Sequence, residues 1–424
     1  MKTTSALVPK ALRLPALGAL MCLANVAHAA DLQDLHLQAK VYGFINAEVE
    51  SVEADGGATP LQRRGRVSDG NSRLGFSGSI AIDATSRGLW QLEGSLNNFD
   101  QGGVNDQGAS ETLTSRNSFV GIEDDRFGRV IVGNNDSAYR SLIGSGGEMG
   151  GNLGMSSHGL DLWNNTSAQM TGNATSIFSR GESRYKNSVH YFSPTWAGLS
   201  AAASIGFDEA LADGANHDRY SAALKYAIGS FEIGAGFDRQ RNTGADVLRQ
   251  QQGLGFQVDS QPGADTTYLK LVASYKLPTH TYLGLGFEQA RFGFSAFNPP
   301  SSGGIYPSVQ AGHMTQEGVM ASVAQDLDEK TSLMLSYGKL GGLHDAQVGS
   351  SGDYGASQIS LGAQHSFNNW LATYVYYTRI QNKAQQNVNL GESPLYSNDA
   401  GTSSAYLAPG NNPRAFGVGL IARF

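Results

Sequence analysis

Residues 416–424 read Phe-Gly-Val-Gly-Leu-Ile-Ala-Arg-Phe, and every second side chain in this stretch is apolar. The apolar face consists of Phe416, Val418, Leu420, Ala422 and Phe424. A period of two is the pattern of a β-strand whose two faces meet unlike surroundings. Chain ends usually fray unless they are tied into a sheet. The stretch therefore predicts a last strand that closes a barrel, with its apolar face toward lipid.

Segments with the same alternation recur along the chain and are separated by turn residues. We expect sixteen strands, at residues 40–50, 72–83, 87–97, 115–123, 127–134, 184–193, 198–207, 217–227, 230–240, 266–276, 280–290, 315–325, 331–340, 356–366, 369–380 and 415–424. Their second face is mostly Gly, Ser, Asn and Gln, and only 16% of all residues are charged. A soluble sandwich would carry dense charge on its outward face, whereas a polar second face suits a water-filled lumen.

Backbone groups in lipid must all be hydrogen-bonded, so strands cross a membrane only as a closed barrel. The predicted fold class is all-β, a transmembrane antiparallel β-barrel of about 16 strands. The connections support it because they alternate in length, as short periplasmic turns and long outer loops do. Short ones fall at residues 84–86, 124–126, 228–229 and 326–330, and long ones at 51–71, 241–265, 291–314 and 381–414.

The longest irregular stretch, residues 135–183, follows the fifth predicted strand and is Gly-rich and of mixed charge. It is too long for an ordinary loop. We expect it to fold into the lumen and narrow it; a disordered surface loop is the alternative. Its candidate constriction charges are Asp136, Glu148 and Asp161. The candidate pore-wall cations, on the polar faces of their strands, are Arg73, Arg116, Arg184, Lys186 and Arg379. Aromatic residues near segment ends, which include Tyr42, Tyr374 and Tyr376, are expected in the girdles at the membrane interfaces.

The N-terminus has the pattern of a secretory signal peptide. Lys2, Lys10 and Arg13 precede an apolar stretch at residues 14–26 and an Ala-His-Ala cleavage site at 27–29. The stretch is too short to span a membrane as a helix, which takes about 20 residues. The predicted organisation is a signal peptide at 1–29 and a barrel domain at 30–424. The only cysteine, Cys22, lies within the signal, so the exported protein has no disulfide to stabilise it.

Composition and motifs exclude several classes of function. The chain has 37 acidic and 30 basic residues, and an acidic balance argues against nucleic-acid binding, which needs clustered cations. The histidines show no HExxH or other metal-ligand spacing, and no G-x-S-x-G elbow is present. The sequence therefore predicts no enzyme, no catalytic residues, no metal and no cofactor. A soluble adhesin would need its apolar face hidden between two sheets.

Several motifs occur in the order and spacing of a known family. They are Tyr-Gly at 42–43, Ser-Arg-Leu-Gly-Phe-Ser-Gly at 72–78, Phe-Val-Gly at 119–121, Phe-Gly-Arg-Val at 127–130, Asn-Ser-Val-His-Tyr-Phe-Ser-Pro at 187–194 and the terminal Phe424. Together they resemble the general porins of Gram-negative outer membranes, in particular the 16-stranded neisserial and burkholderial type. The similarity runs over nearly all of the chain after the predicted signal.

The resemblance implies an outer-membrane homotrimer for passive diffusion of ions and small hydrophilic solutes. It implies outer-membrane lipids and the outer-membrane assembly machinery as partners, with Phe424 as assembly signal and residues 135–183 as constriction loop. Two features depart from the family pattern: Asn134 stands where an Arg is common, and the Pro-Glu-Phe loop tip is absent. The alternative is a substrate-specific channel of 16–18 strands. We expect weak ion selectivity that leans toward anions, because Arg73, Arg116 and Arg184 remain.

Overall fold

The structure is a computed structural model, and its contacts divide the chain into residues 1–37 and residues 38–424. The fold is that of the second unit. The described residues are 37–68, 70, 72–96, 113–145, 147–149, 176–209, 211, 214–298, 306–390, 395 and 407–424. The predicted signal peptide at 1–29 and the candidate Asp161 lie outside them.

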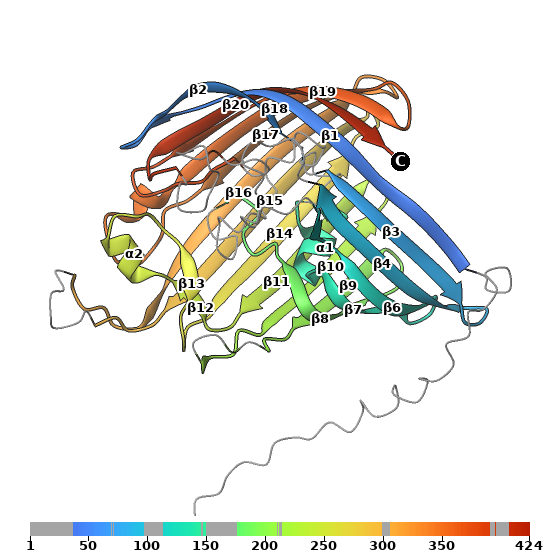
Figure 1. Ribbon diagram of the computed structural model, residues 1–424, viewed down its shortest axis with the longest axis horizontal. Helices are drawn as coiled ribbons and strands as arrows, with labels where there is room; N and C mark the ends of the chain where they lie inside the picture. The colour runs from blue at the N-terminus through green and yellow to red at the C-terminus, as the bar shows by residue number, and fades with distance from the viewer. Residues whose placement is uncertain are drawn as a thin grey trace, which may run out of the picture. The chain divides into compact units, whose positions relative to one another are not determined.

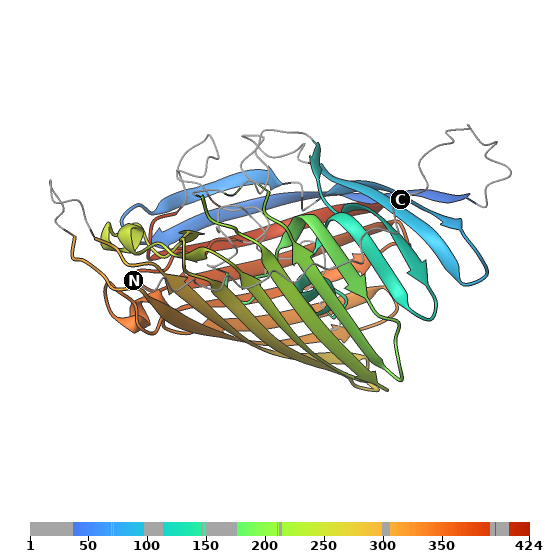
Figure 2. The same ribbon diagram turned by 90° about the horizontal axis from the view of Figure 1, so that it is seen from below.

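Sixteen antiparallel strands form a closed barrel, as predicted (Figure 1). They are β1 (Leu37–Gly56), β3 (Arg73–Ala81), β4 (Ser86–Leu96), β6 (Ser118–Asp124), β7 (Gly128–Asp136), β8 (Arg184–Phe192), β9 (Leu199–Gly206), β10 (Arg219–Ile228), β11 (Phe231–Gln240), β14 (Thr266–Lys276), β15 (Thr281–Phe294), β16 (Gly312–Asp326), β17 (Thr331–Leu340), β18 (Ala356–Ser366), β19 (Leu371–Asn382) and β20 (Asn411–Arg423). Successive strands pair as neighbours, which Figure 2 shows as an ordered run of colours along the wall.

The barrel closes where β20 pairs with β1. Their register runs from Phe44 opposite Arg423 to Gly56 opposite Asn411. This long ladder joins the two ends of the fold, and we call it the seam. The alternation at residues 416–424 therefore corresponds to the closing strand that it predicts.

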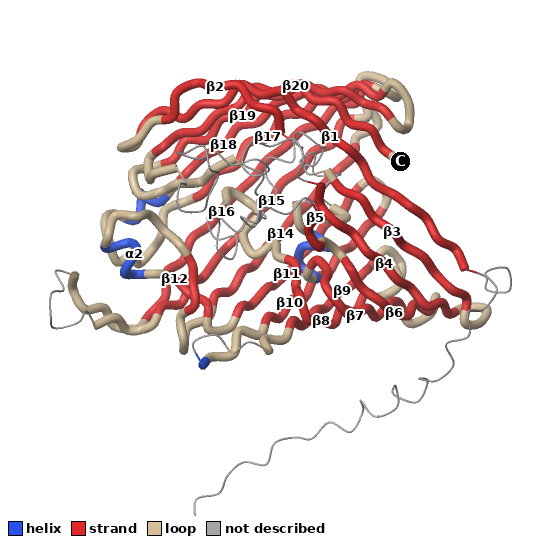
Figure 3. Tube along the Cα trace, viewed as in Figure 1, coloured by secondary structure: helices blue, strands red, loops and turns tan. Residues whose placement is uncertain are grey.

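Within residues 51–71, expected as a loop, residues 51–56 instead continue β1 and residues 61–68 form β2 (Leu61–Ser68) (Figure 3). β2 pairs with β1 from Glu48 opposite Ser68 to Ala54 opposite Leu61. Smaller elements complete the fold. They are β5 (Leu113–Ser115), β12 (Thr243–Ala245), β13 (Val258–Ser260), α1 (Ala138–Ile143), α2 (Val247–Gln251) and the 3-10 turn η4 (Ser351–Tyr354).

The two faces of the wall differ in the way that the alternation predicts. One face is apolar and exposed, as at Val49, Leu92, Val120, Leu224, Leu285 and Val418. The other holds polar residues that contact one another and the segment around α1; this is the inner face. Three tyrosines that we expected in the interfacial girdles lie on the inner face instead: Tyr42, Tyr374 and Tyr376. Their hydroxyls donate to carboxylates of that face.

The two ends of the barrel also differ. Strand pairs such as β10–β11 and β16–β17 are joined by short turns at one end. β1 begins at this end and β20 finishes there, since the number of strands is even. No helix within the described part of the chain is long and apolar enough to span a membrane.

Candidate functional site: charges on the inner wall

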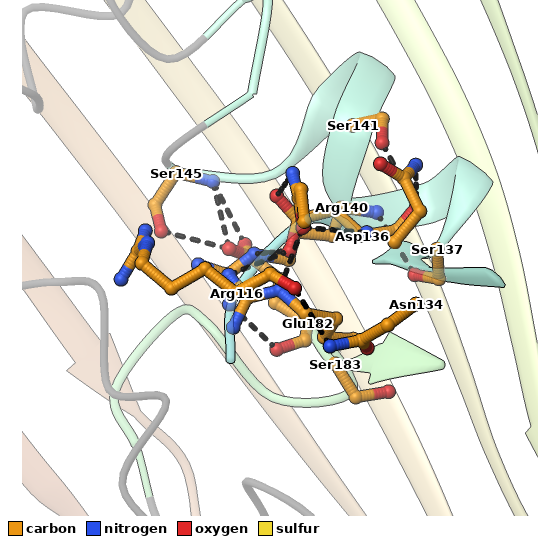
Figure 4. A network of polar contacts seen from close by, with 12 residues as sticks. Arg116, Asn134, Asp136, Ser137, Arg140, Ser141, Ser145, Glu182 and Ser183 are labelled. Carbon is orange, nitrogen blue, oxygen red and sulfur yellow. Dashed lines mark hydrogen bonds and ion pairs between the residues drawn. The ribbon is translucent and has the colours of Figure 1, made fainter. Parts of the chain in front are cut away.

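A polar cluster surrounds Asp136, the last residue of β7 (Figure 4). Its Oδ1 lies 2.9 Å from Nε of Arg140 and 3.1 Å from Nη2 of Arg184. Its Oδ2 accepts a hydrogen bond of 3.0 Å from Nδ2 of Asn117, and Asn117 Oδ1 accepts one of 2.6 Å from Arg184. Two guanidiniums thus share one carboxylate, so the cluster keeps a positive balance. The sequence predicted Asp136 and Arg184 as site residues but not that they form an ion pair.

Arg116 lies on the same side of the barrel, between β5 and β6. Its Nε contacts Oε1 of Glu93 at 2.7 Å, and its Nη1 donates to Oγ of Ser95 at 3.2 Å. Asn134 donates from Nδ2 to the carbonyl oxygen of Arg116 at 2.7 Å. Asn134, the position that departs from the family pattern, therefore helps to hold the backbone of a neighbouring arginine.

Arg73, at the start of β3, is the third wall candidate on this side. Its guanidinium carbon lies 4.7 Å from the centre of the Phe44 ring. This is within the range in which a cation is attracted to an aromatic face. Arg423 lies opposite Phe44 in the seam, so it faces the same side of the wall.

The described beginning of the 135–183 segment lies against the inner face of β9, β10 and β11. The backbone N–H of Ala138 donates to Oγ of Ser204, and that of Tyr139 donates to Oγ of Ser221. Ile143 lies over two glycines of β11: a Cβ on Gly236 would be 2.5 Å from its Cδ1. Small and hydroxylated wall residues thus make room for α1 and supply acceptors for its first N–H groups.

Tyr139 is fully buried in this packing. Burial raises the pKa of its phenol well above the ordinary value, and the nearby carboxylates of Glu288 and Glu182 raise it further. Tyr139 therefore stays neutral at any physiological pH. Further along, Glu148 makes an ion pair of 2.5 Å with Lys225, a residue on the inner face of β10.

The described end of the segment is held to the wall by four buried charges. Arg180 Nε contacts Oε1 of Glu288 on β15 at 2.6 Å. Lys270, on β14, contacts Glu182 and lies 3.0 Å from Oε2 of Glu288. All four side chains are fully buried. We call Arg180, Glu182, Lys270 and Glu288 the charge clip. In a buried site each charge needs a partner of opposite sign, and here two cations face two carboxylates.

Sequence reasoning did not find the charge clip. Alternation places Lys270 and Glu288 on the inner face, and Arg180 stands out as a charge within the segment. Their pairing could not be read, because the partners are 88 and 108 positions apart. The available signal for a buried ion pair was the presence of two charges, Lys270 and Glu288, at neighbouring inner-face positions.

The structure places two predicted wall residues elsewhere. Arg379 lies on the outer face of β19, where its Nη2 is 3.8 Å from Oδ2 of Asp55, because Tyr376 and Thr378 occupy the inner face. Lys186 is exposed and, like Arg184, alternates with Tyr185, whose hydroxyl donates to Asp238 on the inner wall; of the two, Arg184 contacts Asp136. A positive φ of 48° at Asn187 interrupts the alternation at this point.

Phe424, the predicted assembly signal, is partly exposed and tied to β1 by its backbone. Its carbonyl oxygen accepts from the N–H of Gly43 at 3.0 Å, and its N–H donates to the carbonyl oxygen of Gly43 at 3.1 Å. No group of three His, Cys, Asp or Glu side chains that could hold a metal occurs among the residues that the structure describes.

The profile of the Gram-negative porin family matches residues 16–385. The chain belongs to this family. It is therefore a channel protein of the bacterial outer membrane and not an enzyme. The ion pairs described above consequently belong to a porin barrel. A comparison with curated protein sequences gives no match.

Solved porin structures share the fold at low sequence identity. The anion-selective porin from Comamonas acidovorans has a TM-score of 0.66 at 17% identity, over 92% of this chain and 100% of that chain. OmpT of Vibrio cholerae in its trimer form has a TM-score of 0.58 at 15% identity, over 92% and 99%. OmpF of Salmonella typhi has a TM-score of 0.57 at 18% identity, over 91% and 97%. These similarities concern the fold alone.

Proposed function

We propose that this porin is a general-diffusion channel for ions and small hydrophilic solutes, with a weak preference for anions. The observation that carries the proposal is the charge distribution around Asp136, where Arg140 and Arg184 share one carboxylate. Arg73 adds a cation on the same side of the barrel, and Arg116 lies there in an ion pair with Glu93. Fields are focused between low-dielectric walls, so such a cluster attracts anions more than isolated surface charges would.

In this proposal residues 135–183 form the constriction. Support comes from both described ends of the segment, which contact inner-face residues: α1 on β9–β11 and the charge clip on β14 and β15. Asp136 and Glu148 are then the constriction charges of the segment, and Arg73, Arg116 and Arg184 are those of the wall. Solutes would be sieved by the width that the segment leaves and by the field across it.

Planar-bilayer recording of the purified protein tests the channel. We expect open, ohmic conductance. In a KCl gradient, the sign of the reversal potential should show that Cl⁻ is more permeant than K⁺. The proposal would be contradicted if the bilayer shows no conductance while the protein is folded, as judged by a difference in gel mobility between heated and unheated samples. A reversal potential of the opposite sign would contradict the assigned preference.

Liposome swelling separates general diffusion from a substrate-specific channel. With uncharged sugars of rising mass, a general porin gives a rate that falls smoothly with solute size. One solute that enters far faster than others of its size would favour a substrate-specific channel instead.

We also propose that the protein is exported with cleavage after Ala29 and assembles as a homotrimer. The trimer form of the similar OmpT structure supports the assembly state. N-terminal sequencing of the outer-membrane form should begin at Ala30. Light scattering of the detergent-solubilised protein should give three chains per particle, and a monomer mass would contradict the trimer.

A further inference from the structure

The inner face beside the seam repeats one arrangement in three rows. In each row a tyrosine of one strand lies flat across a glycine of the next, and its hydroxyl reaches a carboxylate on the strand beyond. The rows are Tyr374–Gly419–Glu48, Tyr376–Gly417–Glu50 and Tyr42–Gly75–Glu93. We call them the tyrosine rows.

The first row crosses β19, β20 and β1. Tyr374 lies opposite Gly419, and Gly419 lies opposite Glu48. A Cβ on Gly419 would be 2.1 Å from Cζ of Tyr374, so only glycine leaves room for the ring. The Tyr374 hydroxyl is within hydrogen-bond distance of Glu48 and of Oδ1 of Asn46, the latter at 2.7 Å.

The second row lies two residues away on the same strands. Tyr376 is opposite Gly417, and Gly417 is opposite Glu50. A Cβ on Gly417 would be 2.4 Å from Cε1 of Tyr376. The Tyr376 hydroxyl donates to Glu50, whose other oxygen contacts Nε of Arg66 at 2.6 Å. This carboxylate thus has a tyrosine on one side and a cation on the other.

The third row crosses β1, β3 and β4. A Cβ on Gly75 would be 2.2 Å from Cζ of Tyr42, and Gly75 lies opposite Glu93. The Tyr42 hydroxyl donates to Oε2 of Glu93 at 3.1 Å, while Arg116 contacts Oε1. The arrangement therefore recurs on strands that share only β1 with the other two rows.

The tyrosine rows remove carboxylates from the surface of the inner wall. Glu48 and Glu50 are only 2% and 4% exposed, although both point to the inner face. Glu93 has a side-chain exposure of 8%. Two cations of the same region are more accessible than these carboxylates: the Arg66 side chain is 21% exposed, and Lys40 on β1 is exposed, whereas the Arg116 side chain is 9% exposed. The wall thus presents more positive charge to the lumen than its residue count indicates.

We propose that Tyr42, Tyr374 and Tyr376 are selectivity-determining residues that keep Glu48, Glu50 and Glu93 away from permeating cations. Each hydroxyl donates to an oxygen of its carboxylate, and the burial of the three carboxylates keeps a permeating ion from direct coordination. The attraction between two charges falls with distance and with ionic screening, which acts over about 8 Å at physiological salt. The inference rests on the proposed channel function and assigns the anion preference to covered acids as well as to the arginines of the inner wall.

The test is the reversal potential of purified variants in a KCl gradient. Tyr376→Ala uncovers Glu50, and we expect a change of about twofold in the permeability ratio toward K⁺, because a newly accessible charge acts in a confined field. Gly417→Ala should act in the same direction, since its new Cβ displaces the Tyr376 ring. Tyr376→Ala combined with Glu50→Gln should return the ratio to the wild-type value. Glu48→Gln alone should leave it unchanged.

The matched control is Gly65→Ala on β2, where a new Cβ meets its nearest heavy atom at 3.8 Å. It should leave the permeability ratio unchanged. If Tyr376→Ala fails to form a heat-modifiable barrel, Gly417→Ala and the pair Tyr42→Ala and Glu93→Gln decide by the same criteria. Wild-type ratios in folded, conducting Tyr376→Ala or Gly417→Ala channels would overturn the inference while the channel function stands. A shift caused by Glu48→Gln alone would also overturn it.

Discussion

The wall of β14 and β15 and the seam between β20 and β1 both bury carboxylates on the inner face, but with different partners. On the wall, Glu182 and Glu288 contact the cations Lys270 and Arg180. At the seam, Glu48 and Glu50 accept hydrogen bonds from the hydroxyls of Tyr374 and Tyr376, and Glu50 also contacts Arg66. The charge clip ties a separate segment to the wall, whereas the tyrosine rows tie neighbouring strands to one another.

The difference shows what each kind of partner contributes. A buried cation cancels a full charge, so its loss leaves an isolated ion in a site without water. A phenol contributes a dipole and a flat cover, so its loss removes a hydrogen bond and opens the carboxylate to the lumen. Substitutions in the charge clip should therefore change stability most, and substitutions in the tyrosine rows should change stability less and selectivity more.

Replacement of Lys270 by Met should give the largest effect. It leaves Glu182 and Glu288 buried with one cation fewer, which costs about 3–5 kcal/mol of unfolding free energy. Urea unfolding followed by tryptophan fluorescence measures the change. The control is Lys276→Met, on the same face of β14 but exposed, which should change the midpoint little. Equal midpoints for both variants would show that the charge clip adds no stability.

Tyr374→Phe should have the next largest effect. It removes the hydroxyl that lies beside Glu48 and Asn46 and should cost about 1–2 kcal/mol, as expected for a hydrogen bond near a charged group. The readout is the temperature at which the folded gel band disappears. Tyr377→Phe, on the outer face of the same strand, is the control, and an equal loss in both variants would argue against the first tyrosine row.

Gly236→Val tests how α1 is seated on the wall. The new side chain occupies the space of Ile143 Cδ1 and should cost about 1–3 kcal/mol through overpacking. Single-channel recording should also show altered conductance, since α1 must move. Gly88→Val is the matched control in β4, because a Cβ there meets nothing closer than 3.9 Å. Unchanged conductance in the Gly236→Val variant would show that α1 does not contribute to the constriction.

Arg73→Ala should have the smallest effect on stability and a measurable one on selectivity. Loss of this inner-face cation should shift the permeability ratio toward K⁺ by about twofold, since the field at the narrow part of the pore weakens. Arg379→Ala, on the outer face, should leave the reversal potential unchanged. A larger shift for Arg379 than for Arg73 would reverse the assignment of the two faces.

Alternation was sufficient to predict the sixteen strands, because each strand has lipid on one side and polar contacts on the other. Alternation did not assign side chains to the correct face where the inward residues are amphipathic. Tyr374 and Tyr376 have an apolar ring and a polar tip, so their residue type fits the membrane interface as well as the inner face. Because Tyr376 and Thr378 were not recognised as the inward residues of β19, Arg379 was assigned to the lumen instead.

Other features depend on contacts that a single sequence does not display. The β2 strand contains Arg63, Arg64 and Arg66, and such charge is typical of a loop, yet it pairs with β1. The alternation at Lys186 is broken by the left-handed backbone of Asn187. The charge clip depends on pairs of residues from distant segments, and spacing along the chain carries no information about such pairs.

The first tyrosine row also has a consequence for the order of folding. Tyr374 and Glu48 are 326 positions apart. Contacts between such distant positions require a large loop to close, and folds dominated by them form slowly. The hydroxyl of Tyr374 can reach Glu48 only once Gly419 of the last strand lies between them. This row therefore forms in the final step of assembly. Its hydrogen bonds mark a completed barrel, and a chain that lacks the last strand cannot form them.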